Sequence, residues 1–238
     1  MSSAASPLSV AQAEDQHFSI RPLQPTIGAE LHGIDLRHPL DDAARDAIRA
    51  AVLKYKVVFF RDQKLNADEH SAFASRFGPL YIHPSSKRDQ HIAALHRIAG
   101  EPARPAALKD AYHTDTSWRL VPTWGAVLRA VNLPEVGGDT IWIDAAAAYE
   151  GLSSEVKERL NGLHVTHDFR DALLEAGLDY PIVAHPIVRV HRETGQKILW
   201  VNFSQKPFII GLDRTESCEL LEIILRQYKQ PEYQVRFS

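Results

Sequence analysis

Residues 182–203 read IVAHPIVRVHRETGQKILWVNF, and this stretch decides which class of fold the sequence predicts. Two runs rich in β-branched residues, 182–190 and 197–203, flank the polar segment HRETGQ. This pattern predicts two antiparallel strands joined by a turn. Further strand patterns occupy 18–23, 29–36, 57–60, 125–133, 139–143, 163–169 and 233–237. Many short strands with few helices predict a mostly β protein with flanking helices, a sandwich or barrel rather than alternating strand–helix units.

Capping residues predict where the helices begin. A side chain that accepts a hydrogen bond from the first helical turn, followed by apolar positions three and four residues apart, is typical of a helix start. Three such starts lie at Asp41 or Asp42, at Asn66 with Glu69, and at Asp213 with Glu216. The first and third helices are expected to run to about Tyr55 and Tyr228, and two shorter helices are expected near 144–150 and 153–161.

The length suits one large folded domain or two small ones, and all-β single domains often have this length. The chain has 238 residues, of which 45% are hydrophobic and 24% charged, ordinary values for a globular protein with a sizeable core. Residues 1–16 (MSSAASPLSVAQAEDQ) have no basic start followed by an apolar run and predict a disordered lead-in rather than a secretory signal. Residues 17–238 are then expected to be the folded part of the chain.

Charge and cysteine content exclude several classes of partner. A net charge of −3 predicts no attraction to nucleic acid or to a membrane surface. No apolar run approaches the roughly 20 residues that span a bilayer. Cys218 is the single cysteine, which excludes an intrachain disulfide and favours a reducing compartment. The expected location is the cytoplasm.

The segment AYHTDTSW, residues 111–118, carries the candidate chemistry. Its His113 and Asp115 are two residues apart, and in an extended segment such residues point to the same face. An imidazole nitrogen and a carboxylate oxygen could therefore bind one metal ion, as two corners of a 2-His-1-carboxylate iron site. With 12 histidines in the chain, one His-x-Asp pair is also expected by chance.

A glycine-rich segment, GGDT at 137–140, precedes one of the predicted strands. Glycines allow a close approach of the backbone, and the hydroxyl of Thr140 can donate a hydrogen bond to an anionic oxygen. The alternative interpretation is a simple turn between strands, which these glycines equally satisfy.

Several blocks of the chain together resemble the taurine dioxygenase (TauD/TfdA) family of Fe(II)- and 2-oxoglutarate-dependent oxygenases. The resemblance extends from about His17 to the C-terminus. The blocks, in the family's order, are FGPLYIHP (77–84), YHTDTSW (112–118), LRAVNLPEVGGDTIW (128–142), HDFR (167–170), HPIVRVHRETGQKILWVN (185–202) and PEYQVRF (231–237).

The resemblance implies roles for particular residues. His113 and Asp115 match the first two iron ligands, and Thr140 matches the hydroxyl that contacts the 2-oxoglutarate carboxylate. His83 stands where sulfonate-binding members place a substrate-contacting histidine, although a plain loop histidine is an equal alternative. Lys109 stands where the taurine enzyme has an asparagine, and we expect it either to pair with an anionic substrate or to be solvated. This difference speaks against taurine itself as substrate.

Relative to the family, the chain ends early. Members continue past the PEYQVRF block to a distal histidine ligand and an arginine that binds 2-oxoglutarate. The pair at His191 and Glu193 repeats the ligand spacing, but it lies in the expected turn and faces solvent. The resemblance therefore implies a double-stranded β-helix (jelly roll) whose C-terminal strands are missing, in a C-terminally incomplete domain. We expect a fragment of a longer enzyme, with a naturally truncated product as the alternative.

The family's chemistry implies the cofactors and the reaction. The expected activity oxidises a small organic acid such as a sulfonate or sulfate ester, using Fe(II), 2-oxoglutarate and O2 and releasing succinate and CO2. Homodimers or homotetramers are expected by the same resemblance. Two alternatives remain: a non-catalytic remnant of such an enzyme, and a cupin-like protein that binds zinc at the same pair.

Overall fold

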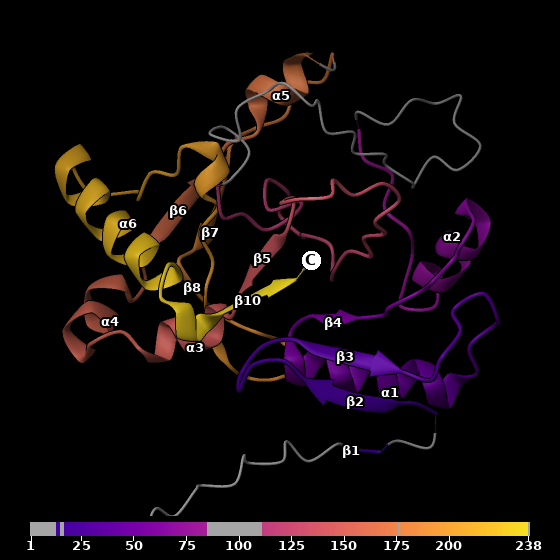
Figure 1. The fold of residues 1–238 in the computed structure, drawn as a ribbon. Coiled ribbons are helices and arrows are strands. Elements are labelled where there is room, and N and C mark those ends of the chain that lie inside the picture. Colours follow the sequence, from indigo (N-terminus) through magenta and orange to yellow (C-terminus); the bar gives the residue numbers. More distant parts are fainter. Residues whose placement is uncertain (1–12, 15–16, 85–110, 176, 238) are drawn as a thin grey trace, which may run out of the picture.

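The N-terminal layer is a small sheet covered by a helix. The computed structural model describes residues 13–14, 17–84, 111–175 and 177–237. Its first sheet has the order β1-β2-β3-β4, antiparallel except for the parallel β3–β4 pair. These strands are Ala13–Glu14, Ser19–Pro22, Ala29–His32 and Val58–Phe59. Helix α1, Asp42–Tyr55, lies along this sheet, and α2, Ala67–Ser75, follows it (Figure 1).

The second part of the chain contains three strand pairs and four α-helices among the described residues. Antiparallel pairs join β10 with β5, β6 with β7, and β8 with β9. In chain order the elements are β5 (Thr140–Ile143), α3 (Ala145–Glu150), α4 (Ser154–Leu160), β6 (His164–His167), α5 (Arg170–Glu175), β7 (Val183–Pro186), β8 (Val188–Val190), β9 (Lys197–Leu199), α6 (Arg214–Tyr228) and β10 (Gln234–Phe237). The protein is thus an α+β fold of sheets and helices.

The three capped helices begin where the sequence predicts. Asp41 accepts a hydrogen bond from the backbone of Ala44 at 2.7 Å and so caps α1. Asn66 and Asp213 each form a complete capping box with the glutamate three residues later. These contacts satisfy backbone donors that a helix leaves unpaired at its start, each worth about 1 kcal/mol.

The hairpin at 182–203 is confirmed, but its first half is split into two strands. Val183–Pro186 pairs with β6, whereas Val188–Val190 pairs with β9. Between them, Ile187 is fully buried in the larger core, beneath α6. The turn closes through a hydrogen bond of 2.8 Å from the His191 amide to the Gln196 carbonyl. This stretch therefore connects two strand pairs around one core.

One expectation about secondary structure is wrong, and one helix was not expected. The predicted strand at 125–133 is irregular in the structure, because no strand of the described residues pairs with it. Helix α5 was not predicted, because its six residues are too few for a helical repeat of apolar positions.

Strand β10 joins the two parts of the molecule. It pairs with β5 over four residues, and its Val235 packs with Ile27 and Phe59 of the N-terminal layer. The Phe59 ring also stacks on Phe237, with 3.7 Å between the ring centroids. Figure 1 shows β10 beside β5, between the N-terminal sheet and the helices α3 and α6.

Gly28 is required at this junction, and replacing it should destabilise the fold. Its φ is +85°, and an added Cβ would lie 2.9 Å from Val235. We expect Gly28→Ala to lower the free energy of unfolding by about 2–4 kcal/mol, from the left-handed backbone and from overpacking. Denaturant titration measures this. Gly33→Ala is the matched control, since Gly33 has φ +90° but nothing within 4 Å. Equal losses in the two variants would contradict a packing role.

Candidate metal centre

The candidate ligand segment 111–119 is held by residues that follow β9. The amide of Phe203 donates to the carbonyl of Tyr112 at 2.9 Å. The side-chain amide of Asn202 donates to Ser117 Oγ at 2.9 Å and to the Thr114 carbonyl at 3.3 Å. Asn202 and Ser117 are both buried, so water does not compete strongly for these bonds. The hairpin at 182–203 therefore supports the segment that carries the predicted ligands.

The structure brings His113 and Asp115 together. His113 Nε2 lies 3.5 Å from Asp115 Oδ1, and both side chains are more than half exposed. His113 Nδ1 lies 3.1 Å from the Ala111 carbonyl, a geometry in which Nδ1–H donates and Nε2 keeps its lone pair. Metal-binding histidines are commonly oriented by such a bond.

A metal ion fits between these two atoms. Atoms 3.5 Å apart are closer than twice a metal–ligand bond of about 2.1 Å, so one ion can contact both. The Asp115 carboxylate raises the pKa of His113, and His113 in turn lowers the pKa of Asp115. The imidazole and carboxylate thus stabilise each other's charged forms, and a cation would replace the shared proton.

No third ligand joins them in the part of the chain that the structure describes. There, no group of three His, Cys, Asp or Glu side chains is arranged to hold a metal ion. Glu193, which repeats the ligand spacing with His191, is bound elsewhere. Its carboxylate accepts hydrogen bonds from Arg49 at 2.7 Å and from the Trp124 indole at 2.6 Å. The interpretation of Glu193 as a turn residue without a metal role agrees with this geometry.

Thr140 is the first residue of β5, directly after the glycine turn. Gly137 and Gly138 have φ of +77° and +79°, values that favour glycine, so the turn needs both. Thr140 is exposed, and its hydroxyl forms no hydrogen bond with the described residues. It is free to bind a ligand, but no contact in the described structure joins it to His113 or Asp115.

His83 lies near the pair, inside an aromatic cluster that the sequence did not predict. Its ring lies 6.1 Å, centroid to centroid, from both Trp118 and Phe169, edge-on to each. Trp118 stacks on Phe169 at 5.9 Å and meets Tyr180 edge-on at 4.9 Å. His83 also makes a small contribution to the lowered pKa of Asp115, which comes first from the hydrogen bond with His113. Lys109, the other predicted substrate contact, lies outside the described residues.

Two histidines are buried behind this segment. His185 Nε2 donates to the carbonyls of Ser117 and Arg119, at 2.8 and 3.0 Å. The His167 ring lies 5.0 Å from that of His185, is fully buried, and forms no hydrogen bond with a described residue. Burial, with added repulsion from His185, lowers the pKa of His167 to about 4. His167 is therefore neutral in the folded protein at neutral pH.

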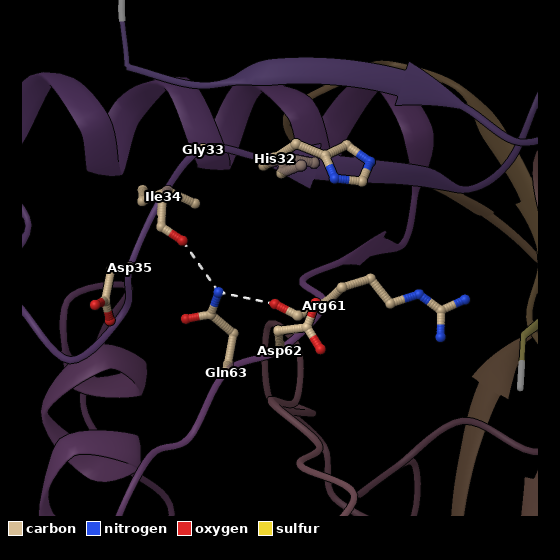
Figure 2. A pocket seen from close by; sticks show the side chains of 8 residues that line it. His32, Gly33, Ile34, Asp35, Arg61, Asp62 and Gln63 are labelled. Atoms are coloured by element: carbon tan, nitrogen blue, oxygen red, sulfur yellow. Dashed lines mark hydrogen bonds between the residues drawn. The ribbon is translucent and has the colours of Figure 1, made fainter.

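A separate open hollow of about 330 Å³ lies at the end of β3 (Figure 2). The Gln63 side chain crosses it and donates to the carbonyls of Ile34 and Arg61, both at 3.0 Å. The Gln63 oxygen accepts from the Leu36 amide at 2.9 Å. Gln63 thus uses its polar atoms to hold two loops together, and none of the predicted site residues lines this hollow.

Within this α+β fold, one short, well-supported segment presents an imidazole and a carboxylate together, two of the three ligand types of a 2-His-1-carboxylate iron site. The family model "Taurine catabolism dioxygenase TauD, TfdA family" matches residues 19–238. The chain belongs to this family. No helix of the described residues is long and apolar enough to cross a membrane.

Known relatives agree with this assignment. A (S)-phenoxypropionate/alpha-ketoglutarate-dioxygenase of Sphingobium herbicidovorans is 31% identical, over 90% of this chain and 80% of the relative. An alpha-ketoglutarate-dependent sulfonate dioxygenase of Saccharomyces cerevisiae is 33% identical, over 87% of this chain and 54% of the relative. The crystal structure of a taurine dioxygenase from Burkholderia xenovorans superposes with a TM-score of 0.79 at 39% identity, covering 93% of this chain and 76% of the other.

Proposed function

We propose that the protein is an Fe(II)- and 2-oxoglutarate-dependent dioxygenase that oxidises a small sulfonate or sulfate ester. The observation that carries the proposal is the His113–Asp115 pair, 3.5 Å apart, in a chain of the TauD/TfdA family. Sulfonates and sulfate monoesters present the same SO3⁻ head group, so one site can recognise both. The sulfonate dioxygenase among the relatives supports this substrate class.

The residues of the chain bind and orient the reactants. His113 and Asp115 would hold the iron ion, which together with 2-oxoglutarate and O2 supplies the oxidising power. Thr140 would donate a hydrogen bond to a carboxylate of 2-oxoglutarate. His83 would contact the head group of the substrate, and Trp118 with Phe169 would exclude water from that side. Lys109 is proposed as a second contact with the acid.

We further propose that the fold is a jelly roll whose third iron ligand comes from polypeptide outside the described residues. The exposed apolar side chains of the irregular segment support this. Leu128, Val131 and Leu133 are 68%, 64% and 65% exposed, a large apolar surface for a segment with strand-forming residues. A further strand that paired with this segment would cover these side chains and complete the sheet.

Succinate formation tests the proposed reaction. The chain is loaded anaerobically with Fe(II), supplied with 2-oxoglutarate and O2, and offered a panel of alkylsulfonates, alkyl sulfates and phenoxyacetates. We expect succinate to form in step with loss of one of these acids. The controls are the same mixture with Zn(II) instead of Fe(II), and the mixture without O2. Absence of succinate with every acid, at full iron loading, would refute either the class of reaction or the class of substrate.

A non-catalytic, metal-binding role is the second candidate, because the described residues provide two ligands rather than three. Anaerobic titration with Fe(II) and 2-oxoglutarate separates the two functions. A chelated complex gives a visible charge-transfer band, whereas a remnant that binds iron weakly gives none. Metal analysis of the purified chain tests the cupin-like alternative, which requires zinc.

We propose a cytoplasmic homodimer or homotetramer with no nucleic-acid or membrane partner. Light scattering after size-exclusion chromatography measures the assembly, and fractionation of cells measures the location.

A further inference from the structure

Arg119 is a half-buried cation next to the candidate metal centre, and it has no anionic partner in the part of the chain that the structure describes. Its guanidinium carbon lies 4.3 Å from the centre of the Tyr81 ring. Among the described residues no carboxylate pairs with this guanidinium, and it forms no hydrogen bond with them. Other arginines of the described structure do pair with carboxylates, for example Arg170 with Asp168 at 2.7 Å, whereas Arg119 combines a missing counter-ion with a place beside the candidate metal centre. A cation that packs on an aromatic ring but lacks a counter-ion is ready to bind one.

The backbone of Arg119 is fixed before any ligand binds. Its amide donates to the Thr116 carbonyl at 3.0 Å, which closes a tight turn after Asp115. Its carbonyl accepts from the buried side chain of His185 at 3.0 Å, and His185 also binds the Ser117 carbonyl. Because His185 of β7 already fixes the backbone of this turn, binding a ligand would cost mainly the conformational entropy of the Arg119 side chain.

The side chain of Arg119 faces the same group of rings that contains His83. Tyr81, on which the guanidinium packs, has its ring 6.4 Å from that of His83. His83 in turn is close enough to Asp115 to affect its pKa. A row of neighbouring side chains therefore extends from Arg119 through Tyr81 and His83 to the His113–Asp115 pair. Trp118, directly before Arg119, stacks on Phe169 beside this row.

We propose that Arg119 binds the anionic head group of the substrate and so selects acids over neutral compounds of the same shape. This inference rests on the proposed function, which it deepens by assigning a specificity-determining residue. A guanidinium presents parallel N–H donors that match two oxygens of an SO3⁻ or carboxylate group, whereas a lysine offers a single point charge. The adjacent rings of Tyr81 and Trp118 offer apolar surface for the rest of the molecule.

Calorimetric titration of the full chain, without added metal, tests the assignment directly. The probes are hexyl sulfate and, as a neutral molecule of similar length, hexan-1-ol. We expect Arg119→Gln to raise the Kd for hexyl sulfate by roughly tenfold or more, because a charge-assisted hydrogen bond is lost. Arg119→Lys should restore part of the affinity. The Kd for hexan-1-ol should not change. Arg192→Gln, which removes an exposed arginine in the turn between β8 and β9, is the matched control and should bind like the wild type.

Three results would overturn the assignment. These are an unchanged Kd for hexyl sulfate in Arg119→Gln, an equal loss for hexan-1-ol, and a wild type that does not prefer the sulfate. Thermal melting of each variant shows whether a loss of affinity for hexyl sulfate comes from misfolding. If Arg119→Gln is misfolded, the affinity of Arg119→Lys is compared with that of the wild type instead.

Turnover separates this inference from the proposed function. In the iron-loaded chain, Arg119→Gln should raise KM for an alkyl sulfate and leave kcat within about twofold, the signature of lost uniform binding. If no variant forms succinate at all, the proposed function fails while the binding preference still stands. If succinate forms and KM is unchanged, the reaction stands and the role of Arg119 is refuted.

Discussion

Replacing Asp115 with alanine should abolish iron binding by this chain. Within the described residues Asp115 is one of the two proposed ligands at the site, and its carboxylate is the only anion of that pair that could neutralise the ion. Loss of groups that merely orient a ligand costs 10–100-fold in metal affinity, so loss of a ligand should cost at least about 100-fold. Anaerobic titration of Fe(II), followed through the charge-transfer band with 2-oxoglutarate, measures the change.

Asp46→Ala is a suitable control for this experiment. Asp46 lies on α1, is exposed, and pairs only with the neighbouring Arg45 among the described residues. The Asp46→Ala substitution removes the same charge from the protein without changing the site, and the variant should bind iron like the wild type. If Asp115→Ala kept the affinity of the wild type, the His113–Asp115 pair would not be the metal centre. His113→Ala should repeat the result of Asp115→Ala.

The second large effect is a loss of stability in mild acid, caused by His167. Its pKa falls from 6.5 to about 4 in the folded protein mainly because it is fully buried, with smaller contributions from His185 and Arg189. Between these two values the unfolded chain binds a proton that the folded chain does not, so stability falls as the pH falls. By pH 5 the loss should reach about 2 kcal/mol, and below pH 4 this contribution should level off. Urea titrations between pH 7.5 and 4.5 measure the slope.

Substitution of His167 separates this effect from general acid denaturation. We expect His167→Leu to flatten the pH dependence and to keep its stability at pH 7.5, since both ring nitrogens lack partners among the described residues. Some dependence should remain, because burial also lowers the pKa of His185. His164→Gln, on the exposed face of the same strand, should keep the slope of the wild type. An unchanged slope in His167→Leu would show that another group is responsible.

The helices could be predicted because their signals are local. Asn66 and Glu69 form their capping box within four residues, and the same holds for Asp213 and Glu216. Local signals could not decide whether the segment 125–133 forms a strand. A strand requires a partner elsewhere in the chain, and apolar residues alone do not say whether that partner is present. The sequence pattern was that of a strand, but the described residues contain no partner for it.

The difference between local signals and contacts distant in sequence also explains which parts of the site could be predicted. His113 and Asp115 stand two residues apart in one motif, so the family resemblance found them together. Arg119 could not be singled out, because an arginine is notable only when a carboxylate is missing, and that is a property of the folded structure. The supporting bond from His185 joins residues 68 positions apart, which a single sequence does not reveal.

The packing of β10 has a consequence for how the chain folds as it leaves the ribosome. Val235 completes a cluster with Ile27 and Phe59, residues that are synthesised long before it. The first sheet can pair its own strands early, but this part of its apolar surface stays uncovered until β10 has emerged from the exit tunnel. Contacts so distant in sequence also slow folding. We therefore expect nascent chains arrested before β10 to depend on chaperones, because they expose an apolar surface that the finished protein buries.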